Sequence, residues 1–230
     1  MSIIQAKNVK KTYNADTIPV HALNDVNLNV EEGEFTAIVG PSGCGKTTLL
    51  NILGGLDDAT SGHVEIDGTV ITQMSDGDLI DFRLNNIGFV FQAYNLIPVL
   101  TTKENVEFIM LLQKKDEKLR SERTFELLEE MGIADKADKR PSELSGGQQQ
   151  RVAVARALAS KPKFVLADEP TANLDSNSTK DLLDIMAKLN KEEGITFVFS
   201  THDQRVIDRA RRIVHLDDGK IVDDVTVKQS

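Results

Sequence analysis

The chain carries the nonapeptide Gly40-Pro41-Ser42-Gly43-Cys44-Gly45-Lys46-Thr47-Thr48. It follows a short apolar run at residues 35–39, which predicts a buried strand, and precedes residues 49–53, which predict the start of a helix. A strand, a glycine-rich loop, Gly-Lys-Thr and a helix, in this order, are typical of a phosphate-binding P-loop. Glycines let backbone N–H groups converge on an anion, and a helix N-terminus adds partial positive charge. The alternative is a glycine-rich turn that matches by chance, and the flanking elements argue against it.

Two side chains of this loop have distinct expected tasks. Lys46 can reach the β- and γ-phosphates of a nucleotide, and the hydroxyl of Thr47 is placed to ligate Mg²⁺. The residues expected to surround the phosphates are Gly40, Ser42, Gly43, Cys44, Gly45, Lys46, Thr47 and Thr48.

The composition limits the partners of the chain. Its 230 residues fit one large domain, or one domain with a subdomain, and its net charge of −9 argues against nucleic acid as the main partner. Cys44 is the only cysteine, so no internal disulfide can form, which suits a reducing compartment. We see no secretory signal at the N-terminus and no apolar run of 18 residues, so a membrane process would need another chain to cross the membrane.

The pattern along the chain predicts an α/β fold. Strand-like and helix-like segments alternate, which implies a mainly parallel sheet flanked by helices. We expect an edge strand over 3–12, a hairpin over 20–39 that leads into the P-loop strand, and a second hairpin over 63–71. A helix is expected over 203–212, and residues 93–160 have the texture of a helical insertion.

A pair of acidic residues, Asp168 and Glu169, comes directly after the buried apolar run at residues 164–167. Ligands bind at the carboxyl ends of strands in such sheets. Asp168 can therefore help to orient Mg²⁺, and Glu169 can act as the general base that polarises an attacking water. The alternative is a turn with two solvated carboxylates.

The segment Leu144-Ser145-Gly146-Gly147-Gln148 could form a second anion site, because two glycines and a serine hydroxyl stand at the start of a helix. The alternative is an ordinary helix cap supplied by Ser145. A serine cap alone would not need two glycines and a glutamine, which favours the anion site.

Taken together, these segments resemble the ATP-binding subunit of ABC (ATP-binding cassette) transporters. Six separated motifs coincide with the family in its order, namely Gly40–Thr47 (Walker A), Gln92 (Q-loop), Leu144–Gln148 (signature), Phe164–Glu169 (Walker B), Ala172–Asp175 (D-loop) and His202 (H-loop). Tyr13 lies where the family has an aromatic residue that stacks on adenine. Read singly, Tyr13 could be a half-buried loop aromatic, Gln92 a polar residue at a strand end, and His202 a surface histidine.

The resemblance implies a fold, two ligands and a second copy of the chain. The fold would be an ABC cassette, with a RecA-like core and antiparallel β subdomain at 1–92 and 161–230 and a helical signature subdomain at 93–160. The ligands would be ATP and Mg²⁺, and two cassettes would pair head to tail. Ser145 and Gly147 would then contact the γ-phosphate held by the other copy, and Asp175 would bridge the two sites.

Other residues would act at the γ-phosphate and toward the membrane. His202 would hold the γ-phosphate, and Gln92 would sense Mg²⁺ and the attacking water. Gln92 would also relay to a transmembrane permease subunit, whose coupling helix would be received by a groove partly formed by residues 93–106. The chain is then expected to be cytoplasmic and peripheral on the cytoplasmic face of the inner membrane.

Three segments, at 96–98, 144–153 and 167–175, look like the macrolide-exporter and lipoprotein-releasing branch, which also contains peptide-resistance and cell-division cassettes. One alternative is a soluble cassette, or a cell-division regulatory cassette, that acts without transport. A cassette working in translation or on DNA ends is disfavoured by the acidic charge and the absence of coiled-coil heptads. A small-molecule kinase would share the P-loop but would not explain residues 144–148 or His202.

Overall fold

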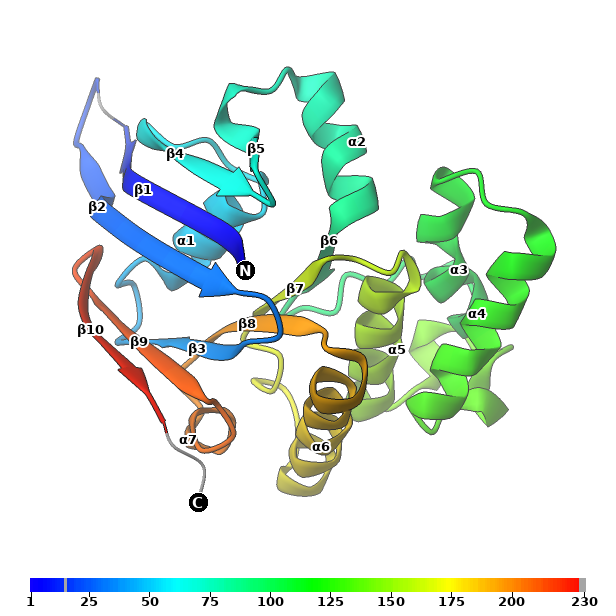
Figure 1. The fold of residues 1–230 in the computed structure, drawn as a ribbon. Helices are drawn as coiled ribbons and strands as arrows, with labels where there is room; N and C mark the ends of the chain where they lie inside the picture. The colour runs from blue at the N-terminus through cyan, green and yellow to red at the C-terminus, as the bar shows by residue number, and fades with distance from the viewer. Residues whose placement is uncertain (15, 228–230) are drawn as a thin grey trace.

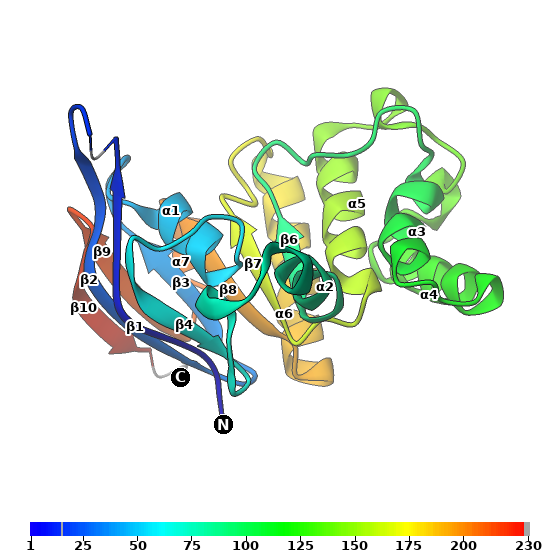
Figure 2. The ribbon, with the colours of Figure 1, turned by 90° about the horizontal axis from the view of Figure 1, so that it is seen from above.

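The computed structural model describes residues 1–14 and 16–227, which form two β-sheets and a group of helices packed beside them. Figures 1 and 2 show the four-stranded sheet beside the β9 and β10 end of the six-stranded sheet, which extends from there toward helices α3, α4 and α5 at the other end of the molecule. The predicted α/β architecture, with a mainly parallel sheet and helices packed against it, is confirmed.

The six-stranded sheet has the order β10-β9-β3-β8-β7-β6. Its strands are β3 (Phe35–Val39), β6 (Ile87–Val90), β7 (Phe164–Asp168), β8 (Thr196–Thr201), β9 (Arg212–Asp217) and β10 (Lys220–Thr226). All neighbours are parallel except β9 and β10. Strand β3 is buried throughout, as expected for a parallel strand covered on both faces.

Alternate residues of the central strands face two different cores. On β7, Phe164 and Leu166 join a core with the four-stranded sheet and α1 (Lys46–Leu53), whereas Val165 and Ala167 join a core with the helices. This alternation is the two-residue period of a strand. The carboxyl ends of β3, β7 and β8 are thereby fixed by packing on both faces.

The four-stranded antiparallel sheet has the order β2-β1-β4-β5, from β1 (Ser2–Tyr13), β2 (Val20–Glu31), β4 (Ser61–Ile66) and β5 (Thr69–Val70). The hairpin predicted over 20–39 is wrong, because β2 pairs with β1 and the turn around Gly33 carries the chain into the other sheet. The edge position predicted for residues 3–12 is also wrong, since β1 pairs with β2 on one side and with β4 on the other.

The hairpin predicted over 63–71 is confirmed. Strands β4 and β5 pair through a two-residue turn in which Asp67 has φ 46° and Gly68 has φ 76°. Both values suit a type I′ turn, whose twist matches that of the flanking strands.

The helices comprise α2 (Asp76–Asn86), α3 (Thr102–Leu112), α4 (Glu117–Glu130), α5 (Gly146–Ala159), α6 (Ser176–Glu193) and α7 (Gln204–Ile207), with short 3₁₀ turns at Ile71–Gln73, Ala134–Lys136 and Pro141–Glu143. Thr101 and Glu104 form a capping box at the start of α3. The helix predicted over 203–212 is wrong beyond Asp208, because Arg211 donates its N–H to the carbonyl of Phe35 and the chain enters β9. Within the described ranges, no helix combines the length and the apolarity that a membrane crossing requires.

Candidate active site

The P-loop joins the end of β3 to the start of α1, and its lysine folds back over the loop. Lys46 is buried and donates through Nζ to the carbonyl of Gly40 at 2.8 Å and to that of Pro41 at 3.0 Å. The ammonium group thus lies above the same loop whose N–H groups are expected to bind phosphate.

Two glycines of the loop are required by packing as well. A Cβ on Gly40 would lie 2.0 Å from the carbonyl oxygen of Leu216. Gly45 has φ 106°, and a Cβ there would lie 2.4 Å from the carbonyl oxygen of Ala22. The loop therefore packs tightly against both sheets, and Gly43, at φ 81°, meets nothing within 4 Å.

The remaining P-loop positions differ in exposure. Cys44 is buried, and its carbonyl accepts the N–H of Gly219 at 3.0 Å, so it fills the loop. Ser42 and Thr47 are exposed and Thr48 is half-buried.

The hydroxyl of Thr47 lies 3.1 Å from each carboxylate oxygen of Asp168, at the end of β7. The hydroxyl of Ser200, at the end of β8, also donates to Asp168. This meeting of Thr47 and Asp168 is what the sequence predicts, whereas no motif pointed to Ser200. Hydroxyl and carboxylate oxygens are hard donors, so the set fits Mg²⁺.

Glu169 and His202 also come together. The carboxylate oxygen Oε1 of Glu169 lies 2.8 Å from Nδ1 of His202, and Thr201 donates to Oε2 at 3.4 Å. Glu169 has φ 46°, a left-handed conformation that is uncommon for a non-glycine residue. The His202 side chain is 72% exposed, yet it contacts the acidic residue expected to act with it, so it is more than an isolated surface histidine.

The signature segment begins α5, and Ser145 caps the helix. Its hydroxyl accepts the N–H of Gln148 at 3.3 Å, and the Gln148 side chain accepts the N–H of Ser145 at 3.0 Å. The expectation that a cap would not need the glutamine is wrong, because the two residues form a capping box. Packing also favours glycine at position 147, since a Cβ there would lie 2.8 Å from Ser178 Oγ.

Asp175 caps α6 in the same way. Its carboxylate accepts the hydroxyl of Ser178 at 2.6 Å and the N–H groups of Asn177 and Ser178. The hydrogen bond from the Ser178 hydroxyl is the largest cause that holds the pKa of Asp175 below its ordinary value.

Gln92 follows β6 and is exposed, and its carbonyl accepts the amide of Asn173 at 3.0 Å. Among the hydrogen bonds of the described residues, none joins Gln92, Ser145, Gly147 or Asp175 to the P-loop.

Tyr13 lies at the end of β1, in a cluster that the sequence did not reveal. Its hydroxyl donates to Asp57 Oδ2 at 2.6 Å, and Lys11 Nζ lies 4.8 Å from the ring centroid and 2.6 Å from Asp57 Oδ1. Burial, followed by the bond to Asp57, raises the pKa of Tyr13, and Thr48 of the P-loop helix acts in the opposite direction. Tyr13 is thus placed beside the P-loop. Asp57 carried no signal, because it lies in a polar connection after α1.

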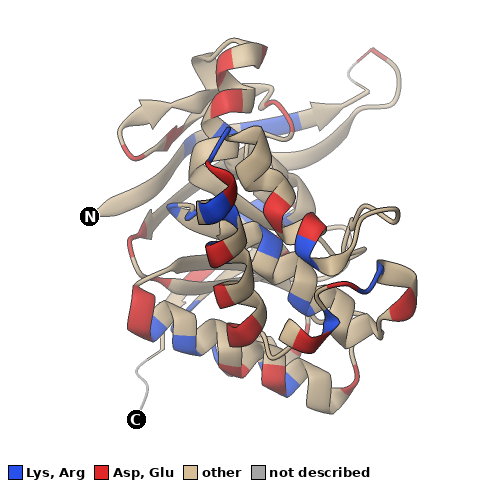
Figure 3. Ribbon diagram, turned by 90° about the vertical axis from the view of Figure 1, so that its right-hand side faces the viewer, with Lys and Arg blue, Asp and Glu red and all other residues tan. Residues whose placement is uncertain are grey.

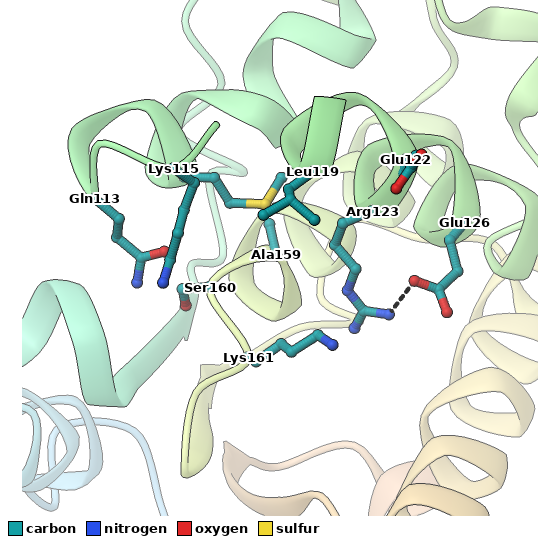
Figure 4. A pocket seen from close by; sticks show the side chains of 10 residues that line it. Gln113, Lys115, Leu119, Glu122, Arg123, Glu126, Ala159, Ser160 and Lys161 are labelled. Carbon is teal, nitrogen blue, oxygen red and sulfur yellow. Dashed lines mark hydrogen bonds and ion pairs between the residues drawn. The ribbon is translucent and has the colours of Figure 1, made fainter. Parts of the chain in front are cut away.

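A cavity of about 540 Å³ lies elsewhere, at the ends of α3 and α5 beside α4 (Figure 4). Its charged side chains have both signs, and Arg123 is paired with Glu126 at 2.7 Å. Figure 3 likewise shows acidic and basic residues interspersed along the helices on this side. The cavity contains none of the predicted site residues, so it is separate from the candidate active site.

A P-loop on a central parallel strand, with an acidic residue at the end of a nearby strand bonded to the P-loop threonine, defines the class of P-loop nucleoside triphosphatases. The family described as ABC transporter matches residues 23–172. The chain belongs to this family, and it is an ATP-binding and ATP-hydrolysing cassette.

Two relatives and one solved structure illustrate the similarity. An uncharacterized ABC transporter ATP-binding protein, MJ1508 of Methanocaldococcus jannaschii, is 48% identical over 96% of this chain and 98% of its own length. The macrolide export ATP-binding/permease protein MacB of Neisseria meningitidis is 43% identical over 98% of this chain, which spans 35% of that protein's length. The solved structure is that of the cassette MJ0796 of Methanocaldococcus jannaschii, a dimer in a post-hydrolysis state bound to ADP and Pi. Its TM-score is 0.92, with 43% sequence identity, and the match covers 99% of this chain and 100% of that chain.

Proposed function

We propose that two copies of this chain pair head to tail around ATP and drive a separate transmembrane subunit. The observation that carries this proposal is the division of the motifs. The P-loop, Asp168, Glu169 and His202 meet at the carboxyl ends of β3, β7 and β8. The signature helix α5 lies beyond the β6 edge of this sheet, among the helices (Figures 1 and 2).

A second copy would complete the site with its own signature. Ser145 and Gly147 of that copy would face the γ-phosphate, and Asp175 would lie between the two sites. The dimeric form of the similar cassette with ADP and Pi supports this pairing. A lone chain would then bind ATP but lack the second half of the site.

Within one chain, the proposed reaction uses groups that already face one another. Lys46 would leave the carbonyls of its own loop to bind the β- and γ-phosphates. Glu169 would take a proton from the attacking water, and His202 would hold the γ-phosphate beside it. Thr47 and Asp168 would hold Mg²⁺, which when bound supplies positive charge that neutralises the transferring phosphate.

The conformational change that follows ATP binding would reach the membrane partner through the segment after Gln92. Val99, within this segment, is 71% exposed, so an apolar side chain remains available there. The name of the MacB relative joins an ATP-binding part to a permease, which supports a membrane partner of that kind. We place the chain on the cytoplasmic face of the membrane, with the helical subdomain at 93–160 as the part that receives the partner.

Affinity purification from detergent-solubilised membranes tests this function. The tagged chain should retain an integral membrane protein in a fixed ratio, and Val99→Asp should lose that protein while keeping its own ATP turnover. Retention of ribosomes or DNA instead, or of no membrane protein by either form, would contradict the proposal.

A further inference from the structure

The connection between β6 and α3, residues 92–101, has no helix or strand, yet side chains from other parts of the chain hold its carbonyls. Asn173 binds the carbonyl of Gln92, and the buried Asn105 binds those of Ile97, Leu100 and Thr101. Between these sets, the carbonyls of Tyr94 and Asn95 both accept from Arg156.

Arg156 makes these bonds as a fork. Its Nη2 donates to Tyr94 O at 2.8 Å and its Nη1 to Asn95 O at 2.5 Å. The guanidinium carries parallel donors in a fixed plane, so it matches two successive carbonyls in a way that a lysine ammonium does not. No ion pair to Arg156 occurs among the described residues.

The position of Arg156 also explains how a largely buried cation is tolerated. Burial lowers the pKa of the guanidinium from its ordinary value. The residue lies in the last turn of α5, where the helix dipole favours a positive charge. The two carbonyls supply the remaining compensation, because a buried charge must be hydrogen-bonded to be stable.

The accepting residues are in an unusual conformation. Tyr94 has φ 59° and Asn95 has φ 51°, so two successive non-glycine residues are left-handed. Asparagine tolerates this region, but a tyrosine there is strained and persists only where the surroundings impose it. The Arg156 fork binds the carbonyls of both residues.

The same helix touches this segment at its other end. The Tyr94 hydroxyl lies only 3.0 Å from the position of a Cβ on Gly146, the first residue of α5. The segment after Gln92 is therefore contacted by both ends of helix α5. The N-terminal end of this helix also carries Ser145 and Gly147.

We propose that Arg156 is a positioning residue for ATP hydrolysis, which locks Tyr94 and Asn95 and so fixes Gln92 relative to the signature end of α5. This inference rests on the proposed function and on the role expected there for Gln92, which is to sense Mg²⁺ and the attacking water. Movement of the segment after Gln92 is then transmitted to α5, and Arg156 itself touches neither nucleotide nor reacting water.

The first test replaces Arg156 by lysine, which keeps the charge but cannot bridge two carbonyls. For Arg156→Lys we expect the kcat for ATP to fall about tenfold, while the Kd for ATP stays within about twofold, because only orientation is lost. Arg151→Lys is the matched control, since Arg151 lies on the same helix and donates to Met131 O and Asp181 instead. An unchanged kcat in Arg156→Lys, or an equal loss in the control, would overturn the inference.

A double-mutant cycle with Gln92→Ala separates positioning from general damage. If Arg156 acts through Gln92, Arg156→Lys should cause no further loss of kcat in the Gln92→Ala background. If the losses of kcat multiply in the double variant, the inference about Arg156 is overturned, but the role of Gln92 is not. A Gln92→Ala variant with normal turnover would overturn it together with the proposed role of Gln92.

Hydrogen exchange tests the inference even if Arg156→Lys is less stable than the wild type. The amides of Tyr94 and Asn95 donate to the carbonyls of Phe91 and Ala93. They should exchange faster in folded Arg156→Lys than in folded Arg151→Lys, with exchange in the middle of α5 unchanged. Equal exchange rates of these amides in the two variants would contradict the claim that Arg156 holds the backbone of Tyr94 and Asn95 in place.

Discussion

At the scale of single residues, the site depends on a few side chains whose partners differ with their task. Lys46 is bonded to its own loop, Thr47 to Asp168, and Glu169 to His202. Glu169 has a left-handed backbone, the kind of local strain that concentrates at functional sites. These pairs make single substitutions informative.

Glu169→Gln should reduce ATP turnover by about 10²- to 10³-fold, because an amide cannot accept the proton of the attacking water. Nucleotide affinity should stay near that of the wild type, since the side chain keeps its size and can still bond to His202. Steady-state phosphate release and a nucleotide titration measure the two effects. Glu65→Gln, in β4 of the antiparallel sheet, serves as the control, and normal turnover in Glu169→Gln would remove Glu169 from its role.

Lys46→Ala should weaken ATP binding by about tenfold or more, because a charge-assisted contact to phosphate is lost. Titration with a fluorescent ATP analogue gives the Kd. Lys163→Ala, which removes only the exposed pair with Asp67, should leave the Kd unchanged. An unaltered Kd in Lys46→Ala would contradict the assignment of the P-loop.

At the scale of elements, helix caps and turns set where the motifs lie. Ser145 begins α5, Asp175 begins α6 and Asp203 begins α7, each by accepting backbone N–H groups. Three motifs that the family resemblance marks as ligand contacts thus start or adjoin helices. Their residue types serve local folding as well as ligand binding.

Ser145→Ala should lower the free energy of unfolding by about 1 kcal/mol, because the cap and its reciprocal bond to Gln148 are lost. Ser145→Thr should keep most of that stability, since threonine also caps. Chemical denaturation measures both variants, and a Ser145→Ala variant as stable as the wild type would show that the capping box contributes nothing.

Asp203 should make stability depend on pH. Its bonds to Arg205 are the largest cause that lowers the pKa of Asp203 to about 2, and Thr171 adds a bond at 2.8 Å. A lowered pKa means that the stabilisation is fully present above the unfolded value and is lost as the pH falls through the folded value. Asp203→Asn should therefore be less stable by up to about 2 kcal/mol near pH 7, and the difference should shrink between about pH 4 and pH 2. A difference that does not depend on pH would contradict this.

The sequence predicted the local elements well and the long-range pairings less well. Strand β3, the P-loop and α1 follow from residues 35–53 alone, because burial and loop chemistry are local. The pairing of β2 with β1 instead of β3 could not be predicted, since Leu28 and Val30 would be buried in either pairing. The end of α7 is decided by a bond between Arg211 and Phe35, which are far apart in the sequence.

Contacts between side chains of the candidate active site could be predicted only where both residues belong to recognisable motifs. Thr47 with Asp168 and Glu169 with His202 belong to recognisable motifs, and the fold brings each pair together. Asp57, Ser200 and Arg156 stand in stretches that single-chain patterns do not mark, because their importance comes from tertiary contacts.

At the scale of the whole molecule, the central feature of the proposed function is a site that one chain would hold only in part. The P-loop face lies at the carboxyl ends of the parallel strands, and the signature lies at the start of α5 among the helices (Figure 1). Binding of ATP between two such chains would couple nucleotide occupancy to their closure, and through the segment after Gln92 to a membrane partner.

The molar mass of Glu169→Gln with and without saturating ATP, measured by light scattering, tests this claim most directly. The chain has a mass of 25.4 kDa, and ATP should convert the monomer into a species of twice that mass, because binding persists while hydrolysis is blocked. Adding Ser145→Arg to Glu169→Gln should prevent the change while ATP still binds. A Glu169→Gln chain that stays monomeric at saturating ATP would contradict the shared site.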